Sequence, residues 1–199
     1  MQNAIPDDLA TRIAGRTLAQ RGADYADEVR RLLDAGRELM ARCGTSSRPR
    51  VADIVAAAGL SNDAFYRHFS SKDALVAAIL EDGTERLTSY LAHQMAKEPT
   101  PERQVRRWVE GVLDQAADDE IAAATLAVLW NGGSVGDGRP STAAPLAALL
   151  HEPFAALGRT ELDASLAAHA VIGLLSDHLW GETRPTREDV TRITAFLLR

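Results

Sequence analysis

Apolar residues recur at helical spacing along most of the chain, and no segment alternates apolar and polar residues as a half-buried strand would. The first clear pattern predicts a helix from about Ala26 to Arg42, which ends at Gly44. Its apolar face consists of Val29, Leu32, Leu33, Gly36 and Met40. We therefore expect helices to build the whole fold.

The same periodicity continues after a loop at 45–49. It predicts two short helices, Val51 to Ala58 and Ser61 to Phe69, and then a long helix from about Ser70 to His93. After two prolines the remaining helical segments lie near 105–113, 121–130, 143–157, 162–180 and 186–197. The prediction is an all-α chain with a three-helix head at 25–72 and a helical body at 73–199.

Residues 1–24 form an extension before this head. Ile5, Leu9 and Ile13 lie four residues apart, so either a short extra helix or a mobile arm fits the pattern. Arg12, Arg16 and Arg21 would either reach a DNA groove or form a solvated basic face.

The two short helices meet the requirements of a helix-turn-helix. Gly59 can take the left-handed backbone that a sharp turn needs. Ile54, Leu60, Phe65 and Phe69 supply an apolar inner face. The outer face of the second helix is polar and suits a major groove, and it consists of Asn62, Asp63, Ala64, Tyr66, Arg67 and His68.

The charge is distributed unevenly. The chain has a formal net charge of −6, but residues 41–72 hold five basic side chains against two acidic ones. A basic head on an acidic body attracts DNA phosphates while discouraging indiscriminate binding by the rest of the protein.

The run from Val51 to Leu75 resembles the DNA-binding signature of the tetracycline-repressor (TetR) family. Gly59, Ser61, Phe65-Tyr66, His68-Phe69 and Ser71 to Leu75 stand where that pattern expects them. The resemblance implies a transcriptional repressor that binds an inverted-repeat operator in double-stranded DNA as a homodimer. It also implies release by a small-molecule effector and no enzymatic activity.

The resemblance also implies roles for single residues. Ser61 to Ala64 would lie at the groove end of the recognition helix, Tyr66 and His68 would contact phosphates or base edges, and Lys72 would meet the backbone. Arg50 stands where the family often has a hydroxyl residue, and Val55 stands where it often has alanine. The expected DNA-binding residues are Arg50, Ser61, Asn62, Asp63, Ala64, Tyr66, Arg67, His68 and Lys72.

The last two helices carry more apolar surface than one small body needs, and the resemblance implies that they pair with their mates in a dimer. The expected interface consists of Leu166, Val171, Leu174, Leu175, Leu179, Ile193 and Leu197.

The resemblance further implies a ligand pocket in the body. The ligand is unknown, and an Ala- and Leu-rich lining favours an apolar one. Plain core packing is the alternative role of each candidate lining residue: Trp108, Leu126, Trp130, His151, Phe154 and His169.

The sequence leaves two alternative functions open. The run Gly132 to Gly136 matches the G-x-S-x-G pattern of serine hydrolases, but that chemistry needs a strand before the serine, and helical sequence precedes it here. A helical protein-interaction module without a DNA role is the second alternative.

One cysteine and isolated histidines predict neither a metal site nor a cofactor. The first residues, which include Pro6, Asp7 and Asp8, do not read as a signal peptide, and no apolar run approaches the ~18 residues of a membrane span. We therefore expect a cytoplasmic protein with no membrane partner.

Overall fold

The computed structural model describes residues 8–132 and 142–199. These residues form α-helices and one short 3₁₀-helix, with no strand among them, so the all-α prediction is confirmed. The helices are α1 (Leu9–Cys43), α2 (Val51–Ala58), α3 (Asn62–His68), α4 (Lys72–Met95), α5 (Pro101–Leu113), η1 (Asp114–Ala116), α6 (Asp119–Gly132), α7 (Ala143–Ala148), α8 (His151–Ala156), α9 (Glu161–Trp180) and α10 (Arg187–Leu197).

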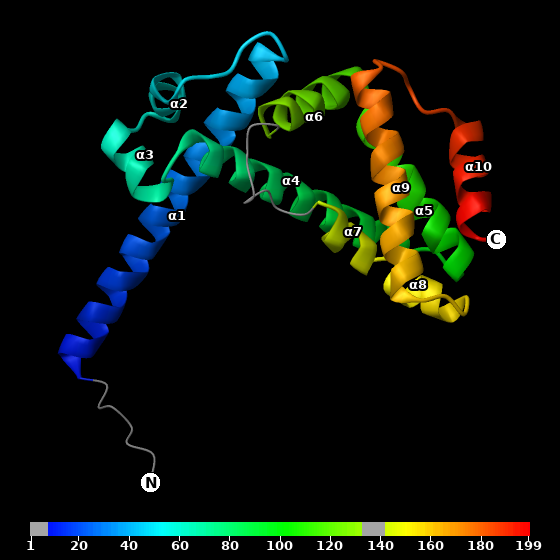
Figure 1. The fold of residues 1–199 in the computed structure, drawn as a ribbon. Helices are drawn as coiled ribbons and strands as arrows, with labels where there is room; N and C mark the ends of the chain where they lie inside the picture. Colours follow the sequence, from blue (N-terminus) through cyan, green and yellow to red (C-terminus); the bar gives the residue numbers. More distant parts are fainter. Residues whose placement is uncertain (1–7, 133–141) are drawn as a thin grey trace.

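Helix α1 differs from the sequence prediction. The expected extra helix and the expected Ala26 to Arg42 helix form one continuous helix of 35 residues, so the boundary drawn at residue 24 falls inside it. The Asp8 carboxylate caps the helix by accepting from the Thr11 amide at 2.7 Å, and this bond lowers the pKa of Asp8. No proline follows Asp8 within α1, and isolated glycines such as Gly15 and Gly22 weaken a helix without ending it. The first half of α1 projects away from the rest of the protein (Figure 1).

Helix α4 belongs to both halves of the molecule. Its first turns, with Leu75, Val76 and Ile79, pack in a head core with α1, α2 and α3. Its last turns, with Leu91 and Met95, pack in a body core with α5, α7, α8, α9 and α10. Helix α4 therefore connects the head to the body, which lie towards its two ends (Figure 1).

Close contacts join α1 to the two helices, α4 and α6, that also pack in the body. Gly36 on α1 faces α4 so tightly that an added Cβ would lie 2.8 Å from Ile79 Cδ1. Helix α6 crosses from the body towards α1 (Figure 1), and its Ala127 is fully buried in the head core. A change in the body thus has two helices, α4 and α6, through which to reach the head.

The segment 143–157, expected as one helix, is divided into α7 and α8. Pro153 lacks the amide hydrogen that a continuous helix would donate to the Leu149 carbonyl, and its ring would clash with that oxygen. The division follows from this missing bond.

Candidate nucleic-acid interface and ligand cavity

The turn between α2 and α3 is held by backbone and side-chain bonds. Gly59 has φ 63° and ψ 37°, the left-handed conformation expected for it. Arg31 of α1 donates to the Ala58 carbonyl from Nε at 3.0 Å and from Nη2 at 2.6 Å, and to the Gly59 carbonyl at 2.9 Å. The end of α2 is therefore fixed to α1 as well as to α3.

The inner faces of the short helices are apolar, as expected. Ile54 and Phe65 are fully buried, and the Phe65 and Phe69 rings pack with centroids 5.9 Å apart. Ser61 caps α3 by accepting from the Ala64 amide at 3.1 Å, and Ser71 caps α4 in the same way. This packing sets which side chains of α3 remain available to DNA.

The open face of α3 carries most of the expected polar residues. Ser61, Asn62, Asp63 and Arg67 are exposed, and Tyr66 is 59% exposed. Ala64, which was expected on the same face, is buried, with 5% of its surface exposed. Its side chain therefore has a packing role in the free protein.

His68 also departs from the expectation of an open DNA-facing group. Its side chain is fully buried, Nε2 lies 2.6 Å from Glu28 Oε2, and the ring packs edge-on against Tyr25 at 4.2 Å. An ionised carboxylate only accepts hydrogen bonds, so the proton of this bond belongs to Nε2. Nδ1 is buried and has no hydrogen-bond partner among the described residues.

Arg67 binds the same carboxylate, with Nη2 2.6 Å from Glu28 Oε2. The bond from His68 and then the one from Arg67 lower the pKa of Glu28. Glu28 therefore fixes the C-terminal end of α3 to α1, while the Arg67 side chain stays 56% exposed with further N–H donors beside the one that Glu28 binds. The sequence pattern did not identify Glu28, because its partners lie about forty residues away.

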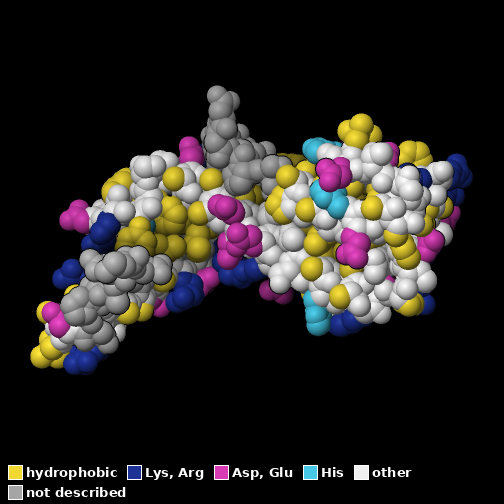
Figure 2. Space-filling model, turned by 90° about the horizontal axis from the view of Figure 1, so that it is seen from below, with side chains coloured by type: hydrophobic (Ala, Val, Ile, Leu, Met, Phe, Trp, Pro, Cys, Tyr) yellow, Lys and Arg dark blue, Asp and Glu magenta, His cyan; other side chains and the backbone are white. Residues whose placement is uncertain are grey.

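Two further basic residues flank the helices of the head. The Arg50 side chain is 83% exposed before α2 and pairs with Asp53 at 3.2 Å, which lowers the pKa of Asp53. Lys72 is partly buried at the first residue of α4. On the face shown in Figure 2, Lys and Arg side chains are scattered among Asp and Glu side chains. Arg12, Arg16 and Arg21 lie on the exposed, projecting half of α1.

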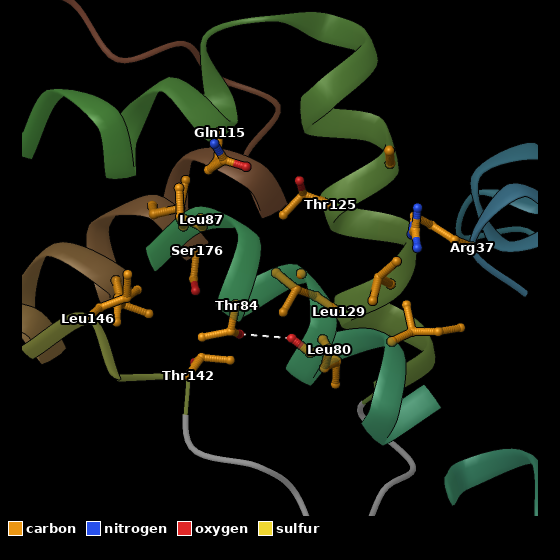
Figure 3. Close-up of a pocket in the computed structure, with 16 residues that line it drawn as sticks. Arg37, Leu80, Thr84, Leu87, Gln115, Thr125, Leu129, Thr142, Leu146 and Ser176 are labelled. Atoms are coloured by element: carbon orange, nitrogen blue, oxygen red, sulfur yellow. Dashed lines mark hydrogen bonds between the residues drawn. The ribbon is translucent and has the colours of Figure 1, made fainter. Parts of the chain in front are cut away.

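A cavity of about 270 Å³ lies where α4, α6 and α9 meet (Figure 3). Its apolar wall consists of Ile79, Leu80, Leu87, Ala124, Val128, Leu129, Leu146, Ile172 and Leu175. Its remaining lining residues are Arg37, Gly83, Thr84, Gln115, Thr125, Thr142 and Ser176. The cavity is therefore mainly apolar with a few polar groups, as small-molecule sites usually are.

The polar groups that line the cavity differ in the hydrogen bonds that they can still form. Thr84 Oγ1 donates to the Leu80 carbonyl at 2.8 Å (Figure 3), so this hydroxyl is left as an acceptor. Thr125, Ser176 and Gln115 face the cavity from α6, α9 and η1. Arg37 reaches it from α1, so the head itself forms part of the wall.

None of the six expected pocket residues lines this cavity. Trp108 is buried in the body core and donates from Nε1 to the Leu146 carbonyl at 3.0 Å, behind the wall. Phe154 is buried in the same core, and Leu126 packs at its edge. His169 is exposed and His151 partly so, while Trp130 contacts the head through Arg48. Large aromatic residues fill the core here, and smaller residues leave the space.

The expected dimer residues fall into two groups. Leu166 and Leu174 are exposed on α9, whereas Val171, Leu175, Leu179 and Leu197 are buried within the protomer and Ile193 is partly buried. Leu162 and Trp180 on α9 and Phe196 on α10 are also exposed, so they extend the apolar surface that Leu166 and Leu174 begin. Helical periodicity marked the apolar residues but not which of two apolar faces would turn inward.

The serine-hydrolase alternative has no support among the described residues. Most of the run Gly132 to Gly136 lies outside them, and the segment before it is helix α6 rather than a strand. No group of three or more potential metal ligands occurs among residues 8–132 and 142–199. None of the described helices is long and apolar enough to cross a membrane.

Residues 32–79 match the family model described as "Bacterial regulatory proteins, tetR family". No curated protein sequence matches the chain. The matched segment contains α2, α3 and the start of α4, so it coincides with the helix-turn-helix described above.

Several solved structures share the fold. A putative transcriptional regulator from Pseudomonas aeruginosa PAO1 is 24% identical with a TM-score of 0.60, over 85% of this chain and 88% of that one. A TetR-family transcriptional regulator from Pectobacterium atrosepticum is 21% identical with a TM-score of 0.58, over 88% and 91%. RolR in complex with resorcinol is 19% identical with a TM-score of 0.60, over 89% of both chains. The family match and these regulators agree with the expectation of a non-enzymatic transcriptional regulator.

Proposed function

We propose that this protein is a homodimeric transcriptional repressor that a small molecule releases from its operator. Its head matches the family model of the tetR bacterial regulatory proteins. The observation that carries this proposal is the helix-turn-helix at 51–69, which turns Asn62, Asp63 and Tyr66 outward on a rigid three-helix support. We expect it to act in the cytoplasm on double-stranded DNA.

The electrostatics of the head support DNA binding. The N-terminal end of α3 presents Ser61, Asn62 and Asp63 to a groove, where side chains at the start of a recognition helix read base edges. Tyr66, Arg50 and Lys72 lie around it with groups that bind phosphate oxygens. Asp63 would accept from a cytosine amino group or repel non-cognate bases.

The exposed apolar side chains of α9 and α10 support a homodimer. Leu162, Leu166 and Trp180 leave more than half of their surfaces in water, as does Phe196. A second copy related by a two-fold axis would bury them in a self-complementary interface. Two heads held in this way would read two half-sites of an inverted repeat.

The cavity supports regulation by a ligand. It is bounded by α4 and α6, which also pack in the head core, so a ligand that favours a different spacing of these helices changes the position of the heads. That is a shift of population towards a conformation that no longer fits successive grooves. RolR, a structural relative, was solved with the small molecule resorcinol.

The test is binding of the purified protein to a labelled DNA fragment flanking its own gene, at two salt concentrations and with competitor DNA. A discrete complex that survives competitor and weakens with salt is the expected result. Tyr66→Ala, folded and dimeric, should weaken that complex. A folded wild-type dimer that forms no discrete complex on this or other promoter fragments, even at low salt, would favour a protein-interaction module instead.

A further inference from the structure

Arg37 occupies an unusual place between the head, the body and the cavity. It belongs to α1, yet it lines the cavity beside residues of α4 and η1 (Figure 3). Its Nη2 pairs with Asp82 of α4 at 3.1 Å and with Asp34 of its own helix at 3.2 Å. The Arg37–Asp82 pair therefore joins α1 to α4 at the edge of the cavity.

The surroundings of Arg37 continue the cavity with a different chemistry. A second hollow shares Arg37, Gly83, Leu87 and Gln115 with it and adds Asp82, Arg86 and Tyr90. One end of the combined space is thus apolar, and the other carries two guanidinium groups together with the Asp82 carboxylate that both of them bind. An amphiphile with an anionic end would suit this division if its charged group replaced Asp82 as the partner of Arg37.

We propose that the cavity binds a small amphiphilic carboxylate, with its apolar part among the leucines and its carboxylate on Arg37. This inference rests on the proposed ligand-regulated function and names the ligand class. A guanidinium holds a planar carboxylate through two parallel bonds, which favours a carboxylate over a neutral hydroxyl group. The hydroxyl groups of Thr125 and Ser176 would serve polar atoms further in.

The charges at the site allow Arg37 to exchange partners. Asp82 also pairs with Arg86 at 3.0 Å, so it keeps a counter-charge when Arg37 turns to the ligand. Asp34 remains beside Arg37 on the same helix. Binding would therefore break the α1–α4 pair without leaving Asp82 unpaired, and it would loosen the head from the helix that leads to the body.

The cavity suits a small ligand. Its volume of about 270 Å³ lies near the lower end of the range of small-molecule sites. Octanoate is a small amphiphilic carboxylate, and 1-octanol and octylamine are nearly equal to it in shape with neutral and cationic ends. The three compounds separate the effect of the charge from that of the chain.

The test measures binding of these three probes to the whole protein without DNA, by calorimetry and thermal shift. We expect octanoate to bind roughly tenfold tighter than 1-octanol, and Arg37→Gln to abolish that preference while leaving 1-octanol unaffected. Asp82→Asn should tighten octanoate binding, because it removes the competing carboxylate. Arg42→Gln, which removes an exposed arginine of α1 paired with Glu38, is the control and should change nothing.

Four results would overturn the proposal: 1-octanol or octylamine binding as tightly as octanoate, an unchanged octanoate affinity in folded Arg37→Gln, weaker octanoate binding in Asp82→Asn, or no binding of any probe up to its solubility limit. Because no DNA is present, these results do not depend on the DNA-binding function. A protein that binds octanoate but no DNA would contradict the proposed function alone.

Discussion

The guanidinium of Arg48 lies over the ring of Trp130, with Cζ 4.9 Å from the ring centroid. Arg48 belongs to the loop before α2, and Trp130 belongs to α6. The tryptophan that was expected to line a ligand pocket instead forms a contact between body and head.

A double-mutant cycle with Arg48→Ala and Trp130→Leu tests this contact. Each single change should lower the free energy of unfolding, and the coupling between them should be about 0.5–1 kcal/mol, as for a partly exposed cation–π pair. Urea unfolding of the four proteins measures it. Arg159→Ala, which removes an arginine over Phe154 in the body, should show no coupling with Trp130→Leu.

Tyr66→Ala and Lys72→Ala should each weaken operator binding, by about 1–2 kcal/mol, while the dimer stays intact. Tyr66 is exposed on α3, and Lys72 lies at the first residue of α4. Neither belongs to the fully buried core of the head. DNA titration followed by light scattering checks both statements. Arg103→Ala, which removes an exposed arginine of α5 in the body paired with Glu98, is the matched control, and equal affinities for all three variants and the wild type would place the DNA-reading face elsewhere.

Leu166→Glu should shift the protein towards monomer. The Leu166 side chain is 60% exposed in the protomer, so the change places a charge in the proposed interface without disturbing the body core. Sedimentation analysis over a range of concentrations measures the shift. Leu18→Glu changes a similarly exposed leucine on the projecting half of α1 and should not alter association; a dimer that survives Leu166→Glu but not Leu18→Glu would move the interface to α1.

The stability that Glu28 contributes should depend on pH. Its pKa is lowered in the folded protein by His68 and Arg67, so the contribution is fully present above the ordinary carboxyl pKa and is lost as the pH falls through the lowered value. The melting temperature of Glu28→Gln should therefore be below that of the wild type near neutral pH, and the difference should shrink as acid protonates Glu28. Glu38→Gln, on an exposed part of α1, should show a much smaller difference, and a Glu28→Gln difference that persists in strong acid would contradict the assignment.

Local sequence patterns predicted much of the head. Gly59 marked the turn, Ser61 marked the start of α3, and Phe65 and Phe69 marked the buried face, because each acts on neighbours within one or two helical turns. The start of α4 was expected at Ser70, and Ser71 caps it instead. The position of His68 was not predictable in this way. It lies on a polar face by sequence, and only the passage of α1 across the end of α3 buries it against Tyr25 and Glu28.

In the body, even more was decided by tertiary packing and less by local sequence patterns. Periodicity identified α5, α9 and α10 as helices with apolar residues, but the large side chains Trp108 and Phe154 fill the core instead of lining a site. The cavity arises where small and medium side chains of α4, α6 and α9 meet, and Arg37 enters it from a helix about forty residues earlier in the chain.

The sequence by itself thus determined most of the helices, some of their caps and the helix-turn-helix, because these depend on contacts between residues close along the chain. Only the tertiary structure decided which apolar faces turn inward, which leucines of α9 stay exposed, and where Arg37 and Trp130 connect head to body. Those outcomes depend on how distant helices fill space together, and helical periodicity contains no information about the partner against which a face will pack.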